Sequence, residues 1–318
     1  MSNDSERPFL TFALFAYNQE QFIREAVAGA FAQTYARMEI ILSDDCSTDR
    51  TFEIMQEMAA SYHGAKQVTL NRNPTNLGLI GHVNRVTAMA RADYIIAAAG
   101  DDISNSDRTE LIARKIEAER PMLIHSDFSA IDVNGCPVEY DDFDRTFDTS
   151  TDVRIAATSL AMYVGGTGTW HKDLFRKYGP ITVAGAFEDL VLGFRAALEG
   201  GISYIDRPVV QYRFGVGISH VDGGTKSAMR HHNEAKAKAR HASLQQRLLD
   251  SSVHNSSDTR SLQRIIRKEM LIQSGKYDLY ARPWIFVTCS MWHPSMILYI
   301  LSVARRNLVS QLQKAFRR

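Results

Sequence analysis

Apolar runs alternate with amphipathic segments over the first 120 residues of the chain. Four short and largely apolar runs are typical of buried strands, and they lie at residues 9–17, 38–43, 67–71 and 93–99. Apolar residues then recur at three- and four-residue spacing, which predicts helices beginning at Asn18, after Ser47-Thr48-Asp49, and over about 79–91 and 107–119. This alternation predicts βαβ units and a mainly parallel sheet.

The pattern changes after residue 120 and predicts a mixed half. The runs 122–133 and 136–140 flank Asn134-Gly135, which is a strong hairpin signal. A polar, acidic stretch follows over 139–152. The other predicted elements are helices near 153–163 and over 188–198, the short strands ISYID and VVQYR, and a helical region from residue 225 onward.

Charge divides the chain into two parts. Residues 1–221 carry 20 Lys and Arg against 30 Asp and Glu, whereas residues 222–318 carry 17 against 6. The sequence therefore predicts one domain over 1–221, with halves of about 1–120 and 121–221, and a basic helical region over 222–318. An acidic front part argues against a nucleic-acid partner, and a basic tail suits an anionic membrane surface. A solvated helical appendage is the alternative.

The tail also contains an uncharged apolar segment. Residues 284–304 lack Asp, Glu, Lys and Arg and precede Arg305-Arg306. The length could span a bilayer, but the central His293-Pro294, the Trp residues and the basic flanks favour a helix lying on the membrane. A helix packed on the first domain and a true span are the alternatives. Three scattered Cys and a polar N-terminus without an export signal predict a cytoplasmic protein, at the inner face of the cytoplasmic membrane.

Acidic pairs stand at three predicted element ends: Asp44-Asp45, Asp101-Asp102 and Glu188-Asp189. Ligands of parallel sheets bind beyond the carboxyl ends of the strands, so these pairs are expected to converge. Carboxylates favour Mg²⁺ or Mn²⁺ held together with substrate phosphates, and they also accept a base N–H or a hydroxyl proton. Taken singly, each pair has the alternative role of capping a helix or matching its dipole.

The chain resembles the inverting family 2 glycosyltransferases of bacterial surface-polysaccharide type, which have the GT-A fold. The resemblance covers residues 9–219 in family order and rests on FAYNQEQFIREAV, FAQTYARMEIILSDDCSTDRT, NPTNLGLIGHVN, GDDIS, FEDLVLGFRAALEG and YIDRPVVQYRFG. It implies an α/β fold with a Rossmann-type, nucleotide-binding mixed sheet flanked by helices, and a helical C-terminal extension.

Site residues follow from the resemblance at matching positions. It implies that the donor nucleotide-sugar lies against Phe15, Tyr17, Asn18, Asp45, Asn76, Gly78 and Asp101. It implies a metal on Asp102, for which His220 is a further candidate, and Asp189 as the catalytic base beside Glu188 and Trp170 in the acceptor site. Two positions depart from the family pattern. Phe15 replaces a small or hydroxylated residue, and Gly100 replaces a small polar or acidic one.

The implied reaction moves one sugar from a nucleotide diphosphate-sugar to a hydroxyl of a glycan or lipid-linked glycan, with inversion and with Mn²⁺ or Mg²⁺. The alternatives are a Mg²⁺-dependent sugar nucleotidyltransferase and a non-catalytic carbohydrate-binding or scaffold relative. The Gly-rich segment 165–169 lacks a Walker lysine and GxGxxG spacing, so it predicts a flexible acceptor loop. Motifs of metalloproteases, serine hydrolases and RNA-binding proteins are absent from the sequence.

Overall fold

The computed structural model describes residues 7–139, 152–216, 225–254 and 256–281, together with Ile297 and Leu301. The chain forms two compact units. The larger unit comprises Met1–Ala184 and Glu188–His220, and the smaller comprises Gly185–Phe187 and Val221–Arg318.

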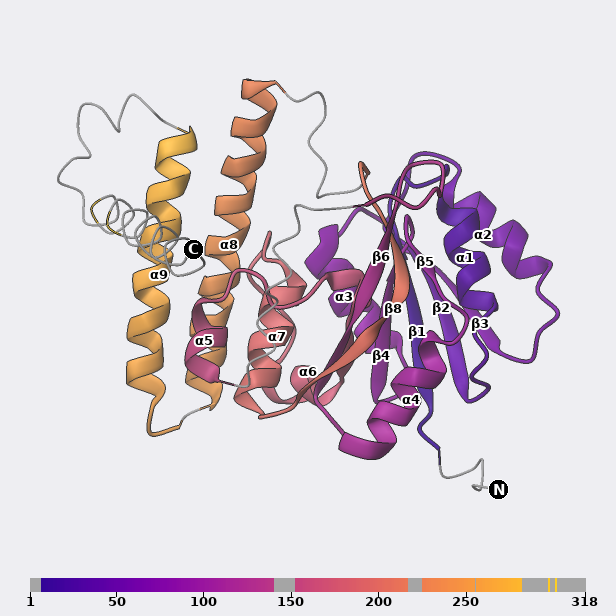
Figure 1. The fold of residues 1–318 in the computed structure, drawn as a ribbon, viewed down its shortest axis with the longest axis horizontal. Coiled ribbons are helices and arrows are strands. Elements are labelled where there is room, and N and C mark those ends of the chain that lie inside the picture. The colour runs from indigo at the N-terminus through magenta and orange to yellow at the C-terminus, as the bar shows by residue number, and fades with distance from the viewer. Residues whose placement is uncertain are drawn as a thin grey trace, which may run out of the picture. The chain divides into compact units, whose positions relative to one another are not determined.

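A single sheet organises the described part of the larger unit. Its strands are β1 (Leu10–Ala16), β2 (Met38–Asp44), β3 (Gln67–Arg72), β4 (Tyr94–Ala99), β5 (Ile103–Ser104), β6 (Leu123–Ile131), β7 (Thr169–His171) and β8 (Ile202–Arg213). They lie in the order β3-β2-β1-β4-β7-β6-β8-β5 (Figure 1). Strands β1 to β4 pair in parallel, as the alternating pattern predicts.

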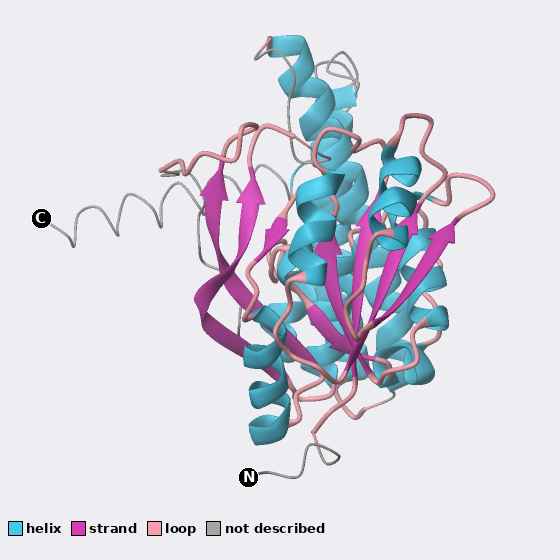
Figure 2. Ribbon diagram, turned by 90° about the vertical axis from the view of Figure 1, so that its right-hand side faces the viewer, coloured by secondary structure: helices cyan, strands magenta, loops and turns pink. Residues whose placement is uncertain are grey.

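The register of the parallel strands brings their carboxyl ends to one edge of the sheet. Ala16 of β1 lies beside Asp44 of β2, Asp44 lies beside Arg72 of β3, and Phe15 lies beside Ala99 of β4. The arrowheads of these strands point to the same end of the sheet in Figure 2. The chain segments that follow these four strands therefore begin close together.

Helices cover both faces of this sheet (Figure 1). The helices of the larger unit are α1 (Ile23–Phe31), α2 (Thr51–Ala60), α3 (Gly78–Met89), α4 (Arg108–Glu119), α5 (Val153–Thr158), the 3₁₀ turn η2 (Gly165–Thr167), α6 (Asp173–Tyr178) and α7 (Glu188–Leu198). Alternate residues of β1, namely Leu10, Phe12 and Leu14, pack against α1, α2 and α4 and are fully buried. Burial of each such side chain contributes about 1.5–3 kcal/mol.

The start of α1 differs from the prediction. Asn18 adopts a left-handed conformation with φ of 51°, and the helix begins at Ile23 after a turn in which Gln19 accepts the Phe22 N–H at 2.9 Å. Asn tolerates this conformation better than most residues do. The Asn18 side chain accepts the N–H of Thr48 at 2.9 Å, so it joins two loops and does not cap the helix.

The second half of the sheet is mixed, and two predictions there are wrong in detail. The Asn134-Gly135 turn forms, but in the described residues its return strand is reduced to a bridge between Ile131 and Pro137. β6 pairs instead with β8 in parallel. The segments predicted as two strands form the single strand β8, with an irregular register where Asp127 faces Pro208. Proline has no N–H for the ladder, so the pairing is interrupted without ending the strand.

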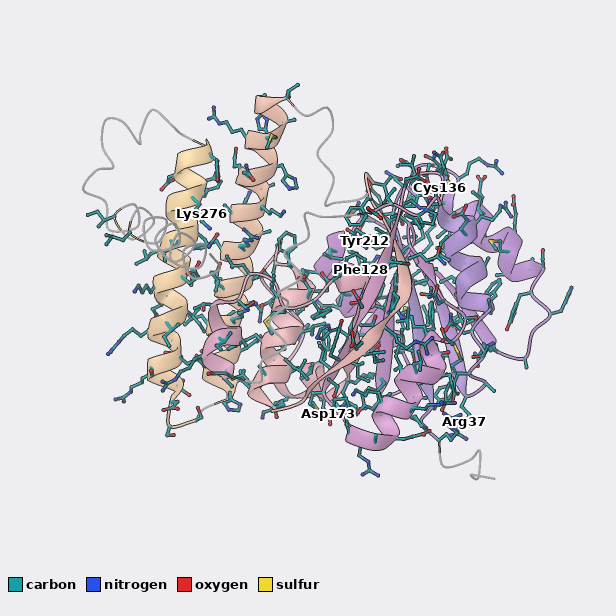
Figure 3. The ribbon with its side chains drawn as sticks, viewed as in Figure 1. Arg37, Phe128, Cys136, Asp173, Tyr212 and Lys276 are labelled. Carbon is teal, nitrogen blue, oxygen red and sulfur yellow. The ribbon has the colours of Figure 1, made fainter. Side chains whose placement is uncertain are left out.

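A small aromatic cluster lies on β6 and β8. Phe128 and Tyr212 stand close together in Figure 3, with ring centroids 5.3 Å apart. Val209 and Val210 complete the buried part of this cluster. It anchors the outer strands of the sheet separately from the main core.

The smaller unit consists, where described, of α8 (Lys226–His254) and α9 (Thr259–Ala281), which pack against each other. Leu244, Leu262 and Ile266 are buried in this unit. None of the helices within the described ranges is long and apolar enough to cross a bilayer. The predicted apolar segment 284–304, apart from Ile297 and Leu301, lies outside the described residues, as do His220 and most of the acidic stretch 139–152.

Candidate functional site

Polar residues gather at the carboxyl edge of the sheet. Figure 3 shows Cys136 at this end and Arg37, which precedes β2, at the opposite end. Tyr17-Asn18 follow β1, Asp45 follows β2, and Asp101-Asp102 follow β4. Tyr17 is 44% exposed, so its ring is accessible at this edge. The structure thus brings together the predicted residues that follow strands β1, β2 and β4.

Asp45 is buried and held by the segment after β3. Its Oδ1 accepts the side-chain N–H of Asn73 at 2.8 Å and the backbone N–H of Leu77 at 2.9 Å. The neighbouring Asn76 accepts the N–H of Gly78 at 2.8 Å. Gly78 has φ of +68° with open space around it, so the glycine serves a backbone conformation that other residues strain to adopt. Asp45 therefore positions the Asn76–Gly78 loop beside its own carboxylate.

A buried polar network supports this carboxylate. Asn71 donates through Nδ2 to the Asn73 side-chain oxygen at 3.0 Å and to Ser43 Oγ at 2.9 Å. Ser43 Oγ lies 2.6 Å from His82 Nε2. Burial lowers the pKa of His82, which favours a neutral ring that accepts the serine hydroxyl. The ring of Phe15 packs edge-on against His82, with ring centroids 5.1 Å apart, so Phe15 supports this polar network.

Asp101 and Asp102 form a carboxyl pair in which Asp102 is buried and Asp101 is partly buried. Asp102 accepts the backbone N–H of Arg213 at 2.9 Å. Burial, and next the negative charge of Asp101, raise the pKa of Asp102 to about 8. Burial also raises the pKa of Asp101, against the opposing effect of a hydrogen bond from Gln19. The two raised pKa values show that the ionised pair lacks a compensating positive charge, which a bound cation would supply.

Two buried arginines hold the surroundings of this pair. Arg213 donates to the backbone oxygen of Asp101 at 2.8 Å and to the carboxylate of Glu25 at 2.5 Å. Arg108 donates to the backbone oxygens of Ala97 at 2.7 Å and Gly166 at 2.9 Å. Arg108 is fully buried, and this burial lowers its pKa to about 9. The two arginines join the end of β4 to β8 and to the Gly-rich segment.

The Gly-rich segment is structured, whereas the sequence predicted a flexible loop. It forms η2 and leads into β7, and Gly168 accepts the N–H of Ala97 at 2.9 Å. A Cβ on Gly166 would stand 3.0 Å from Oδ2 of Asp102, and one on Gly165 would stand 2.1 Å from a carboxyl oxygen of Glu188. Two consecutive glycines of one short turn therefore lie next to the two acidic pairs, Gly166 near Asp102 and Gly165 near Glu188.

Glu188 and Asp189 open α7, where the helix dipole favours negative charge. Asp189 accepts the N–H of Leu190 at 2.7 Å. Burial, and next the charge of Asp189, raise the pKa of Glu188 to about 8. Glu188 is therefore protonated at neutral pH, which removes a competing negative charge from beside Asp189. The buried hydroxyl of Tyr163, near both carboxyl groups, has no hydrogen-bond partner among the described residues.

One predicted site residue is corrected by the structure. Trp170 lies on β7 between Ile95 of β4 and Leu123 of β6, and it is 1% exposed. It belongs to the core and is too deeply buried to contact an acceptor. The described residues also contain no group of three or more metal-ligating side chains. Of the two predicted metal ligands, Asp102 lies within the described residues and His220 lies outside them.

Sequence reasoning missed several residues of the site. Arg108 and Tyr163 lie outside the motifs that carry the resemblance. Asn73 and Arg213 lie inside NPTNLGLIGHVN and YIDRPVVQYRFG, but no role was predicted for them there. The sequence contained a weak signal for Arg213. It ends the apolar strand VVQYR, and a charged side chain that is buried there needs a hydrogen-bond acceptor.

The fold defines an α/β protein of the class in which ligands bind beyond the carboxyl ends of the parallel strands. Residues 11–179, more than half of the chain, match the family described as glycosyl transferase family 2, and the chain belongs to this family. The family match and the comparison with solved structures together confirm the predicted GT-A fold.

Several known proteins are similar to this chain. EpsE of Bacillus subtilis, named as a glycosyltransferase, is 34% identical over 113 residues, which cover 36% of this chain and 40% of EpsE. The succinoglycan biosynthesis protein ExoO of Rhizobium meliloti is 25% identical over 199 residues, covering 62% of this chain and 54% of ExoO. The chain spans about half or less of the length of such curated relatives.

Solved structures share the fold at low sequence identity. TarS of S. aureus in complex with UDP-GlcNAc has a TM-score of 0.58 and 16% identity, covering 92% of this chain and 78% of TarS. The mannosyltransferase PcManGT of Pyrobaculum calidifontis in complex with GDP-Man and Mn²⁺ has a TM-score of 0.57 and 16% identity. It covers 95% of this chain and 81% of PcManGT.

Proposed function

We propose that this protein is a glycosyltransferase that moves a sugar from a nucleotide diphosphate-sugar to a hydroxyl of a glycan or lipid-linked glycan, with inversion. The observation that carries the proposal is the η2 turn, which contacts Asp102 through Gly166 and Glu188 through Gly165. Asp102 belongs to the proposed donor site, and Glu188-Asp189 belong to the proposed acceptor site. Because one short turn lies next to both, the two sites are close together. Family membership and relatives named for polysaccharide synthesis support the same reaction.

The donor nucleotide would lie along the carboxyl edge. Tyr17 offers an accessible ring for the base, and Asp45 offers a fixed carboxylate for a base N–H. Asn18, by contrast, already uses its side-chain oxygen on Thr48 and therefore shapes the pocket. Gly78, at the start of α3, gives the sugar-phosphate part close access to the backbone.

The Asp101-Asp102 pair fits a divalent cation. The two carboxyl groups are adjacent, with Asp102 buried and Asp101 partly buried, and Oδ2 of Asp102 faces Gly166, where a Cβ would crowd it. Mg²⁺ and Mn²⁺ are commonly held by one or two carboxylates plus substrate phosphates, so the pair needs no third protein ligand. When bound, such an ion supplies positive charge that stabilises the departing diphosphate. His220 remains a proposed further ligand.

Asp189 is assigned as the base of a single displacement. It would take the proton of the acceptor hydroxyl as the oxygen forms a bond to the anomeric carbon of the donor sugar. The bond from that carbon to the diphosphate oxygen breaks on the opposite face, and the nucleoside diphosphate leaves with the electron pair. The raised pKa of Glu188 favours its neutral form, which reduces the negative charge beside Asp189.

Nucleotide-sugar binding tests this function directly. We expect at least one member of a panel of UDP-, dTDP-, GDP-, ADP- and CDP-sugars to raise the unfolding temperature in the presence of Mn²⁺, because ligands that bind the native state stabilise it. EDTA should abolish most of that rise. Release of a nucleoside diphosphate on turnover would separate this enzyme from a nucleotidyltransferase, which releases pyrophosphate. No rise with any donor would contradict the proposal.

The smaller unit supports a proposal of peripheral membrane contact. Four basic residues of α9 recur at helical spacing and are exposed, namely Arg260, Arg264, Arg267 and Lys268. Leu271 is exposed one turn further along. An anionic lipid surface attracts such a stripe by about 1 kcal/mol per basic residue. Lipid-linked acceptors would be concentrated at that surface.

We expect the double variant Arg264→Gln/Arg267→Gln to bind vesicles of phosphatidylglycerol and phosphatidylcholine roughly 30-fold more weakly than the unmodified chain. Cosedimentation at low and high salt measures this change. The control is Arg24→Gln/Arg114→Gln, which removes two exposed arginines from the larger unit. Equal vesicle binding by the two variants would refute the role of α9.

A further inference from the structure

The hydrogen bonds that the Asp45 carboxylate already accepts limit which nucleotide base it can bind. Oδ1 of Asp45 accepts two hydrogen bonds, from Asn73 Nδ2 at 2.8 Å and from Leu77 N–H at 2.9 Å. A carboxylate oxygen has about two lone-pair positions, so these donors fill Oδ1. Within the described ranges, no residue donates to Oδ2 of Asp45. The carboxylate therefore has acceptor capacity at one oxygen.

The orientation of the Asn73 amide is fixed by its neighbours. Its oxygen accepts an N–H from Asn71 at 3.0 Å, so its NH₂ group must face Asp45. Asn73 is buried, and its backbone N–H is bonded to the Asp44 oxygen at 2.8 Å. Reversal of the amide would set two NH₂ groups against each other and place two acceptors together. The donor to Oδ1 is thus built into the fold.

We propose that Asn73 is a specificity-determining residue, which limits Asp45 to reading a single N–H and selects a uracil or thymine nucleotide over a guanine nucleotide. This inference rests on the proposed function. Guanine presents two adjacent N–H donors that match both oxygens of a carboxylate. Its second donor would have to displace the Asn73 or Leu77 bond from Oδ1. Uracil and thymine present one ring imide N–H, which Oδ2 alone satisfies.

Adenine and cytosine also offer a donor at this edge, but it is an exocyclic amine. An imide N–H is the more acidic group and makes the stronger hydrogen bond to a carboxylate. These bases should bind between the two extremes. The expected order of affinity is UDP and dTDP first, ADP and CDP next, and GDP last.

Titration calorimetry of the full chain with the five nucleoside diphosphates and Mn²⁺ tests this order. We expect UDP or dTDP to bind about tenfold to a hundredfold more tightly than GDP, as befits one hydrogen bond to a charged group. In Asn73→Ala, Oδ1 loses one donor and gains capacity, so the ratio of GDP to UDP dissociation constants should fall by about fivefold or more. The control Asn84→Ala removes a pair of bonds to Ile181, away from Asp45, and should keep the wild-type ratio.

The wild-type order decides the base inference even where Asn73→Ala folds poorly. GDP, ADP or CDP binding as tightly as UDP and dTDP would overturn it and leave the proposed function standing. Binding of no nucleotide would contradict both. A well-folded Asn73→Ala with an unchanged ratio would remove Asn73 as the determinant.

Discussion

Replacing Asp189 by asparagine is expected to slow sugar transfer by about 10²–10⁴-fold, which is the usual contribution of a general base. Asparagine keeps the shape of the side chain and the oxygen that accepts the Leu190 N–H, but it cannot take a proton. Binding of the nucleotide-sugar should stay within about twofold of the wild type, because Asp189 acts on the acceptor. Single-turnover transfer assays measure the first quantity, and calorimetry with the donor measures the second.

Asp173→Asn is the matched control for this variant. Asp173 lies exposed on α6, where it pairs with Arg176 at 2.7 Å, and it opens a helix much as Asp189 does. Its exposed ion pair contributes little, so transfer should remain near the wild-type rate. If Asp189→Asn transferred sugar at the wild-type rate while chemistry limits turnover, Asp189 would not be the base.

The parallel half of the fold could be predicted from sequence because two independent signals agree there. Strands buried on both faces read as continuous apolar runs, as in Leu10–Ala16 and Tyr94–Ala99, and the intervening helices keep an apolar face. The edge where the strands end then locates Asp45 and Asp102 without knowledge of side-chain positions. The parallel half of the fold and the edge that carries the site therefore followed from local pattern, whereas the roles of individual donor residues came from the resemblance to the family.

The mixed half was predicted less well because its pairing is long-range. β6 and β8 are joined across some 70 residues, and Pro208 sits inside β8 where local signals favour a break. The Asn134-Gly135 turn suggested a nearer partner for β6, yet Pro137 cannot donate to a ladder on that side. Tertiary pairing overrode the local hairpin signal.

The supporting residues of the site were also beyond local reasoning. Arg108 is tied to Gly166 and Arg213 to Asp101, across 58 and 112 residues of sequence. Nothing near Arg108 in sequence distinguishes it from a solvent-exposed arginine, and the apolar strand before Arg213 does not identify its partner. Their burial is visible only when the sheet brings β4, β8 and η2 together, which is also how Trp170 becomes a core residue.

Replacing Asp102 by asparagine is expected to have two opposite effects. Transfer should fall by about 10²–10³-fold, since loss of metal-assisted stabilisation costs several kcal/mol. The ligand-free protein should instead become more stable by about 1–3 kcal/mol at pH 8, because a buried like-charge pair is relieved. The asparagine oxygen still accepts the Arg213 N–H that Asp102 accepts at 2.9 Å, so the local fold is kept.

The stability gain should depend on pH in a defined direction. The pKa of Asp102 is about 8 in the folded protein and about 3.9 in an unfolded chain. The contribution of this carboxyl group to the free energy of unfolding is therefore fully present below pH 4 and is lost as pH rises through 8. Thermal unfolding should therefore separate Asp102→Asn from the wild type at pH 8 and hardly at pH 4. Saturating donor and Mn²⁺ should reverse the order of stability of the two proteins, because only the wild type binds the metal well.

Asp107→Asn, which removes an exposed carboxylate paired with Arg207, should show neither effect. An Asp102→Asn protein that kept metal-dependent transfer would remove Asp102 from the metal site. A variant less stable than the wild type at pH 8 would contradict the raised pKa of Asp102.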